Sequence, residues 1–297
     1  MNAFLVILVT ALGLGGLYFL LASGLSLIFG LMDVLNLAHG AFFGIGGYAA
    51  WIVMDSLGVV DSLALRFLVS VVVAVAAGLL AGFVIEKVLV ARSYGDHLAQ
   101  ILLTLGLGFA LNGLLAGLFT YSPRSLPQPE WLAATSALGG AQIPNSRLVI
   151  IVVAAVVFLG MIGFLRYTRH GLIIRAGAEN RQMVRALGID VRRSFTLVFA
   201  LGGALACLGG ALGAVFFNGV TPTLGQNMLI FSFIVVIIGG LGSVPGTAVA
   251  AVLVALVQQF TNFYANTGLG DLAIVVLLVG TLLVRPQGLL GRKAAST

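Results

Sequence analysis

The chain has 297 residues, of which 60% are apolar and only 8% are charged, and its mean hydropathy is +1.16. Soluble domains carry about 25% charged residues, so no soluble fold could bury this much apolar surface. The composition therefore excludes a soluble protein and indicates one that is embedded in a membrane.

Apolar runs long enough to cross a bilayer recur along the chain. A helix needs roughly 20 apolar residues to span a hydrocarbon core of about 30 Å. Runs of this kind cover residues 4–29, 34–54, 64–85, 98–120, 148–165, 194–217, 229–260 and 269–285. Because the runs are apolar on every face, they predict helices rather than barrel strands. We expect an all-α, polytopic helical bundle of about eight spans, forming a single transmembrane domain over residues 1–297.

The first apolar run is expected to be a membrane span, and the single cysteine a packing residue. No Lys or Arg precedes the first run, so it lacks the basic start of a cleavable signal peptide and should be a retained span. Cys207 lies within an apolar run, which excludes an internal disulfide and a cysteine-based metal site and favours a packing role. We expect no cofactor and no metal.

The basic residues predict the orientation, because short loops rich in Lys and Arg remain in the cytoplasm. Most of the fifteen lie in three segments, which are residues 87–92, residues 166–193 with seven arginines, and residues 285–293. We therefore expect the N-terminus outside and the C-terminus in the cytoplasm. In this orientation 166–193 is a cytoplasmic loop, and 121–147 is an outer loop.

The long run at 229–260 must then begin and end outside. Its middle reads Gly239-Gly240-Leu241-Gly242-Ser243-Val244-Pro245-Gly246, and glycine and proline break helices. The sequence predicts a broken-helix hairpin, with a glycine-packed kinked helix as the alternative. Broken helices at membrane depth are buried in protein or line a watery cavity. This makes Gly239, Gly240, Gly242 and Ser243 candidates for a pathway or gate.

A faint repeat relates residues 26–31 to residues 196–201, in opposite directions across the bilayer. Inverted repeats are typical of transporters, although chance similarity between apolar segments is the alternative.

The loop at 166–193 sets seven arginines against Glu179 and Asp190. We predict a helix over 172–187, with Gly188 as its C-cap and Asp190 as the N-cap of the next span. One stripe of this helix would consist of Ala176, Asn180, Met183 and Leu187. An amphipathic helix favours docking of a soluble partner. The alternative is a basic loop that only fixes topology and touches anionic headgroups of membrane lipid.

His39 is the unusual polar residue near a span, in the stretch Asp33-Val34-Leu35-Asn36-Leu37-Ala38-His39-Gly40. We expect Asp33 to cap the second helix, and Asn36 and His39 to make interhelical hydrogen bonds. A gating or pathway role for Asn36, His39 and Gly40 is the alternative. Catalysis is not expected, because a triad or a metal cluster needs several convergent groups.

The sequence also limits how transport by this chain could be driven. No ionisable residue lies in the middle of an apolar run, which argues against an ion-coupled secondary carrier. The only lysines are Lys87 and Lys293, and neither follows a glycine-rich phosphate loop. The chain is therefore expected to be non-catalytic, and if it pumps, ATP is hydrolysed by another subunit.

Three ordered motifs resemble those of LivH-type permeases, the membrane subunits of branched-chain amino acid ABC importers. Gly24-Leu25-Ser26-Leu27-Ile28-Phe29-Gly30 with residues 35–40 resembles the family's amino-terminal signature. Arg175-Ala176, Glu179-Asn180 and residues 186–189 resemble its ATPase-coupling loop, and residues 239–246 resemble its carboxyl-terminal motif. The fuller Glu-Ala-Ala pattern with a trailing Ile-x-Leu-Pro, found in many other importer families, is missing.

The resemblance implies a permease in the bacterial inner membrane that carries branched-chain amino acids. Urea or short amides, which relatives carry, are the alternative. It further implies a heterodimer with a second, LivM-like permease, two cytoplasmic ATPase subunits and an external substrate-binding protein, with no nucleic acid partner. The residues implied to contact the ATPase are Arg175, Ala176, Glu179, Asn180, Ala186 and Gly188.

Overall fold

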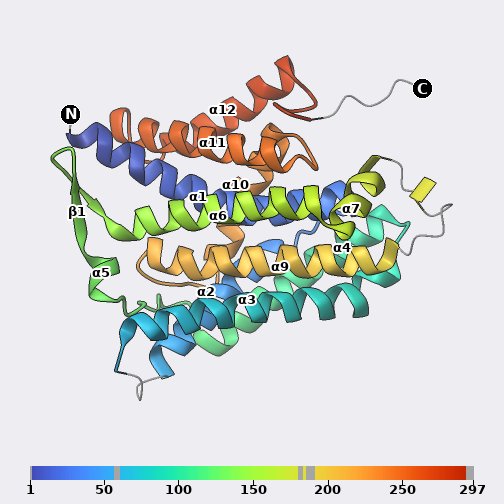
Figure 1. Cartoon of the computed structure of the whole chain (residues 1–297), viewed down its shortest axis with the longest axis horizontal. Helices are drawn as coiled ribbons and strands as arrows, with labels where there is room; N and C mark the ends of the chain where they lie inside the picture. Colours follow the sequence, from blue (N-terminus) through green and yellow to red (C-terminus); the bar gives the residue numbers. More distant parts are fainter. Residues whose placement is uncertain (1, 57–60, 180–182, 185–190, 292–297) are drawn as a thin grey trace.

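The computed structural model describes residues 2–56, 61–179, 183–184 and 191–291, and forms a bundle of long helices (Figure 1). The helices are α1 (Asn2–Met32), α2 (His39–Ser56), α3 (Leu63–Val88), the 3-10 helix η1 (Val90–Ser93), α4 (His97–Phe119), α5 (Glu130–Ala133), α6 (Asn145–Tyr167), α7 (Arg169–Glu179), α9 (Val191–Phe216), α10 (Leu224–Gly239), α11 (Val244–Tyr264) and α12 (Leu269–Val284). The strands β1 (Thr135–Leu138) and β2 (Ala141–Pro144) form an antiparallel pair.

Among the described residues, six helices are long and apolar enough to cross a membrane, namely α1, α3, α4, α6, α9 and α11. Helices α10 and α12 are apolar but have only 16 residues each, and α2 has 18. The predicted all-α polytopic membrane fold is confirmed. The eight predicted runs correspond to the six long helices and to the shorter helices α2, α10 and α12, with α10 and α11 sharing the run at 229–260.

The bundle has two ends that carry different structures (Figure 1). At one end, β1 and β2 lie near the N-terminus. These strands belong to the predicted outer loop 121–147. The opposite end, called here the α7 end, carries α7 and the end of α12. The two loops singled out in the sequence therefore lie at opposite ends of the bundle.

Helices α1 and α9 form the centre of the bundle. They are the most deeply buried of the long helices. In an apolar stretch of 18 residues, 61% of α1 and 72% of α9 is buried inside the protein, compared with 17% of α4 and 11% of α6. The two central helices run antiparallel, since Gly24 lies against Gly202 and Gly13 lies near Phe216. The exposed apolar faces of α4 and α6 fit contact with lipid or with another membrane protein.

The order and packing of the helices form an inverted repeat. In each half a long central helix (α1 or α9) is followed by a non-helical return, a shorter helix (α2 or α10) and a helix that packs on the other half's central helix. Thus α3 packs on α9, and α11 packs on α1. The similar segments 26–31 and 196–201 are not equivalent in this repeat, because the first ends α1 and the second begins α9.

The segment 229–260 forms a helical hairpin, as its glycines and proline predict. Helices α10 and α11 are joined by residues 240–243 and pack against each other. The second arm is longer than expected, because α11 has 21 residues and qualifies as a full span.

Candidate functional site

Helix α2 begins inside the bundle rather than at its edge. The ring of His39 is fully buried, and its Nε2 atom lies 3.1 Å from the carbonyl oxygen of Leu21 on α1. Leu21 lies about 16 Å along α1 from Met32, at 1.5 Å per residue. The interhelical bond expected for His39 is confirmed, and the residue lies at membrane depth.

The return from α1 to α2 is extended and is held by local polar contacts. The Asn36 side-chain oxygen accepts a hydrogen bond from the Ala38 N–H at 3.1 Å, and the Asn36 carbonyl accepts one from the His39 N–H at 3.2 Å. Thr104 on α4 donates to the Leu35 carbonyl at 3.2 Å. Asn36 therefore acts locally at the start of α2, so the interhelical bond expected for it is wrong.

Two sequence expectations in this region need correction. The second span was expected from residue 34, but α2 starts at His39 because residues 33–38 form the extended return. Asp33 therefore cannot cap α2. It follows the last turn of α1 with a positive φ of 55°, and its N–H donates to the Phe29 carbonyl at 2.8 Å.

Helices α2 and α10 begin next to each other at membrane depth. A Cβ atom at Gly40 would lie 2.9 Å from the Leu229 Cβ and still closer to the Gly225 carbonyl oxygen, so only glycine permits this approach. A small cavity of about 70 Å³ adjoins this contact and is lined by Gly40, Asn112 and Gln226 among others. Asn227, the next residue along α10, is exposed. Polar groups within apolar helices thus meet where two helices start.

The residues Gly239, Gly240, Gly242 and Ser243 form a second cluster, at the α7 end. Gly240 ends α10 with φ 98°, and its carbonyl accepts the Ser243 N–H at 3.0 Å across a turn in which Gly242 has φ 78°. This is the geometry of a turn that requires glycine at its third position. Ser243 then caps α11, its Oγ accepting the Gly246 N–H at 3.2 Å.

These two clusters are not brought together. Gly225 lies against Gly40, whereas Gly239 lies at the far end of α10, roughly 21 Å away at 1.5 Å per residue. The turn at Gly242 instead contacts Gly30 near the end of α1. The candidate pathway residues therefore divide between a membrane-depth cluster and an end cluster.

Helix α7 carries the described part of the predicted coupling loop. It begins at Arg169, earlier than the predicted residue 172, and the Thr168 hydroxyl oxygen accepts the Gly171 N–H at 3.0 Å. Ile174 is buried in the bundle, Ala176 is half-buried and Arg175 is exposed. Glu179 is the last residue of α7. Of the other predicted coupling and capping residues, Asn180, Ala186, Gly188 and Asp190 lie outside the described residues.

Comparison with known proteins identifies the family. Residues 7–284 match the model of the family described as "Branched-chain amino acid transport system / permease component". The chain belongs to this family. It is a multi-pass membrane protein and a transport subunit, and the resemblance in its motifs is confirmed.

The permease is similar to members from several organisms. It is 28% identical to the high-affinity branched-chain amino acid permease protein LivH of Escherichia coli K12, over 94% of this chain and 92% of the relative. It is 28% identical to BraD of Pseudomonas aeruginosa, over 96% and 95%. It is 27% identical to LivM of Escherichia coli K12, over 92% and 68%. No solved structure matches the chain.

One buried series of side-chain hydrogen bonds was not predicted from the sequence of this permease. Tyr18 on α1 donates to the Gln258 side-chain oxygen on α11 at 2.7 Å, and the Gln258 amide donates to Asp271 on α12 at 2.7 Å. Tyr18 and Gln258 are visible in the sequence as polar residues within apolar runs, which was the available signal. Among the described residues, no group of three His, Cys, Asp or Glu side chains could hold a metal ion.

Proposed function

We propose that this chain is the permease subunit of an ATP-binding-cassette importer for branched-chain amino acids, and that it forms half of the translocation pathway. The match of the family model to residues 7–284 carries the proposal. The relatives LivH and LivM are two different permease proteins with the same printed function, which supports a heterodimer of this chain with a second, homologous permease.

The proposal includes further partners and an orientation in the membrane. ATP hydrolysis requires separate ATPase subunits, two in this proposal, and an external binding protein delivers the substrate. We place the permease in the bacterial inner membrane, with the α7 end in the cytoplasm and the N-terminus outside. The exposed arginines of α7 and the basic residues near the start of α9 support this orientation.

Helix α7 is the proposed contact with an ATPase subunit. Its buried side, with Ile174, packs in the bundle, while Leu172 is exposed, and Arg175 is exposed on the side of the turn between α10 and α11. Arg175, Ala176 and Glu179 therefore lie on the described part of this helix, and Asn180, Ala186 and Gly188 continue the proposed coupling segment. Such a helix can pass movement of the ATPase to the ends of α1, α6 and α9, against which it packs.

The membrane-depth cluster is the proposed wall of the pathway. Gln226, Asn227 and Asn112 would be costly on a surface facing hydrocarbon, so they should face water, substrate or the second permease. His39 and Asn36 lie behind this wall, fully buried, and hold the start of α2 in place. Gly40 lies directly on it, since it lines the small cavity.

Cysteine labelling tests the pathway wall. In a Cys207→Ala background, Asn227→Cys should react with a water-soluble thiol reagent, and leucine with the complete transporter should slow the reaction. Val152→Cys is the matched control, because Val152 is 60% exposed but lies on apolar α6. Equal reactivity at both positions, unaffected by leucine, would refute the assignment of the wall.

Competitive uptake tests the substrate. Cells that express the complete complex should take up labelled leucine, and excess isoleucine or valine should compete. Urea or short amides compete instead if the permease serves the alternative substrates. Uptake that persists when the ATPase subunits are inactivated would overturn the ABC assignment and favour an autonomous carrier.

A further inference from the structure

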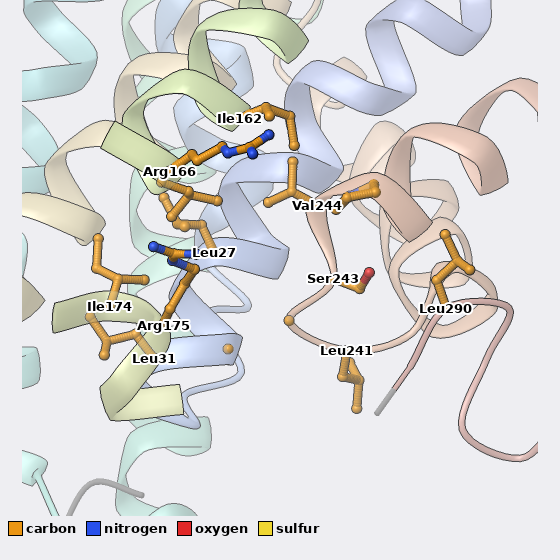
Figure 2. A pocket seen from close by; sticks show the side chains of 14 residues that line it. Leu27, Leu31, Ile162, Arg166, Ile174, Arg175, Leu241, Ser243, Val244 and Leu290 are labelled. Carbon is orange, nitrogen blue, oxygen red and sulfur yellow. The ribbon is translucent and has the colours of Figure 1, made fainter. Parts of the chain in front are cut away.

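A cavity of about 540 Å³ lies at the α7 end of the bundle, and neither the family match nor the proposed pathway accounts for it. Its walls come from the last turns of α1 and α6, from α7 and from the turn between α10 and α11. Figure 2 shows Arg166 and Arg175 on one side of this cavity, and Ser243, Val244 and Leu290 on the other. A volume of this size accommodates a small ligand.

The charge of the cavity is one-sided. Among the described residues that line it, Arg166 and Arg175 are the only charged ones, and none is a carboxylate. Both arginines are exposed, and neither makes an ion pair with a carboxylate of the described residues. The Arg166 guanidinium lies over the ring of Tyr167, 5.6 Å from its centre, a contact that leaves its N–H groups available. Two guanidinium groups at one cavity suit a phosphate, which accepts several hydrogen bonds from arginine.

Apart from Ser243, the other side chains that the structure describes in the wall are apolar. Leu27 and Leu31 of α1 form a buried floor, and Ile162, Ile174 and Leu290 complete the lining. A soluble anion would gain nothing from these groups, because burial of apolar surface stabilises only an apolar ligand. The cavity therefore matches a molecule with a negatively charged head and a hydrocarbon body.

The position of the cavity fits the same chemistry. The lining residues of α1, α6 and α11 are at the ends of three membrane-crossing helices, where hydrocarbon gives way to water. Lipid headgroups lie at this depth. An acidic phospholipid would thus reach the arginines with its phosphate while its acyl chains remain in the bilayer.

We propose that this cavity binds the headgroup of an acidic phospholipid, with its phosphate between Arg166 and Arg175 and its first methylene groups against Leu27 and Leu31. The bound lipid would connect α7 to the turn at Gly242. These two elements line opposite sides of the cavity, so the lipid would hold them at a fixed separation.

Lipid binding to the purified full chain, with its co-purifying subunits in neutral detergent, tests the proposal. Native mass spectrometry compares dioleoyl phosphatidylglycerol with dioleoyl phosphatidylcholine, which shares the acyl chains but carries no net charge. Each basic residue near a headgroup contributes about 1 kcal/mol, or about fivefold in affinity. We expect Arg166→Gln and Arg175→Gln each to weaken phosphatidylglycerol binding about fivefold, and the double variant about 30-fold. Arg169→Gln, an exposed arginine of α7 outside the cavity, should bind like the wild type.

Several results would overturn the proposal. The double variant could retain wild-type binding, or phosphatidylcholine could bind as well as phosphatidylglycerol. Displacement of the lipid by inorganic phosphate would assign the cavity to a soluble phosphate instead. Loss of a co-purifying subunit from the double variant, with lipid binding unchanged, would assign the arginines to a protein interface. Both arginines are exposed, so the variants should fold normally.

Discussion

Replacing Gly242 by alanine separates the two reasons for glycine in the turn between α10 and α11. The first reason is its backbone, since a φ of 78° is unfavourable for alanine by about 1–2 kcal/mol. The second is space, because a Cβ atom would lie 2.9 Å from the Gly30 Cα. Forcing such an overlap typically costs about 1–3 kcal/mol. We expect Gly242→Ala to lower the free energy of unfolding by about 2–5 kcal/mol.

Three other glycines supply matched controls. Gly268 has φ 99° but no neighbouring atom within 4 Å, so Gly268→Ala measures the backbone effect alone, about 1–2 kcal/mol. In Gly30→Ala the overlap with Gly242 is partly offset by a gain of about 0.5–1 kcal/mol in helix propensity. Gly160 is helical with open space around it, so Gly160→Ala should stabilise by about 0.5–1 kcal/mol.

Equilibrium unfolding in mixed micelles, followed by circular dichroism, measures these differences. Leucine uptake at matched membrane levels shows whether the turn also matters for transport, and it should fall in Gly242→Ala and fall further in Gly242→Leu. If Gly242→Ala costs no more than Gly268→Ala, the contact with Gly30 does not constrain the turn. If it unfolds like the wild type, both parts of the reasoning are wrong.

Three further changes probe other parts of the permease. Gln258→Leu should destabilise it by about 1–3 kcal/mol, because the Tyr18 hydroxyl loses its buried acceptor, and unfolding of Tyr18→Phe/Gln258→Leu should show part of this cost restored. His39→Ala should cost about 2–4 kcal/mol through a buried cavity, measured by the same unfolding, whereas Asp61→Ala at an exposed position should be neutral. Glu179→Ala should reduce substrate-stimulated ATP hydrolysis in the assembled transporter. Unchanged stimulation would contradict the coupling role and leave the arginines of this loop as a signal that only fixes the topology.

Much of the fold could be predicted from hydropathy. Lipid requires long apolar helices, and the helix ends at Gly239 and Val244 follow from glycine and proline in the intervening sequence. The orientation rule then required this hairpin to begin and end on the same side of the membrane. Local chemistry and membrane constraints agreed there, so the prediction held.

The start of α2 could not be predicted in the same way. Val34, Leu35 and Leu37 are as apolar as the helices around them, so hydropathy does not distinguish an extended return from a helical turn. What decides the conformation is tertiary, namely the bond from Thr104 to the Leu35 carbonyl and the approach of Gly40 to Gly225. The approach of Asn112 to Gln226 at the small cavity also depends on tertiary structure, because it is set by where α10 begins.

The packing of α2 has a consequence for biosynthesis. Gly46 fits against the backbone at Cys207, which emerges from the ribosome about 160 residues later, a delay of roughly 8–30 s at 5–20 residues per second. During that interval α2 is in the bilayer without its main partner, α9. A translation pause or a truncation before α9 should therefore leave α2 exposed to membrane proteases, while α4, a full-length span that is only 17% buried in the bundle, remains inserted.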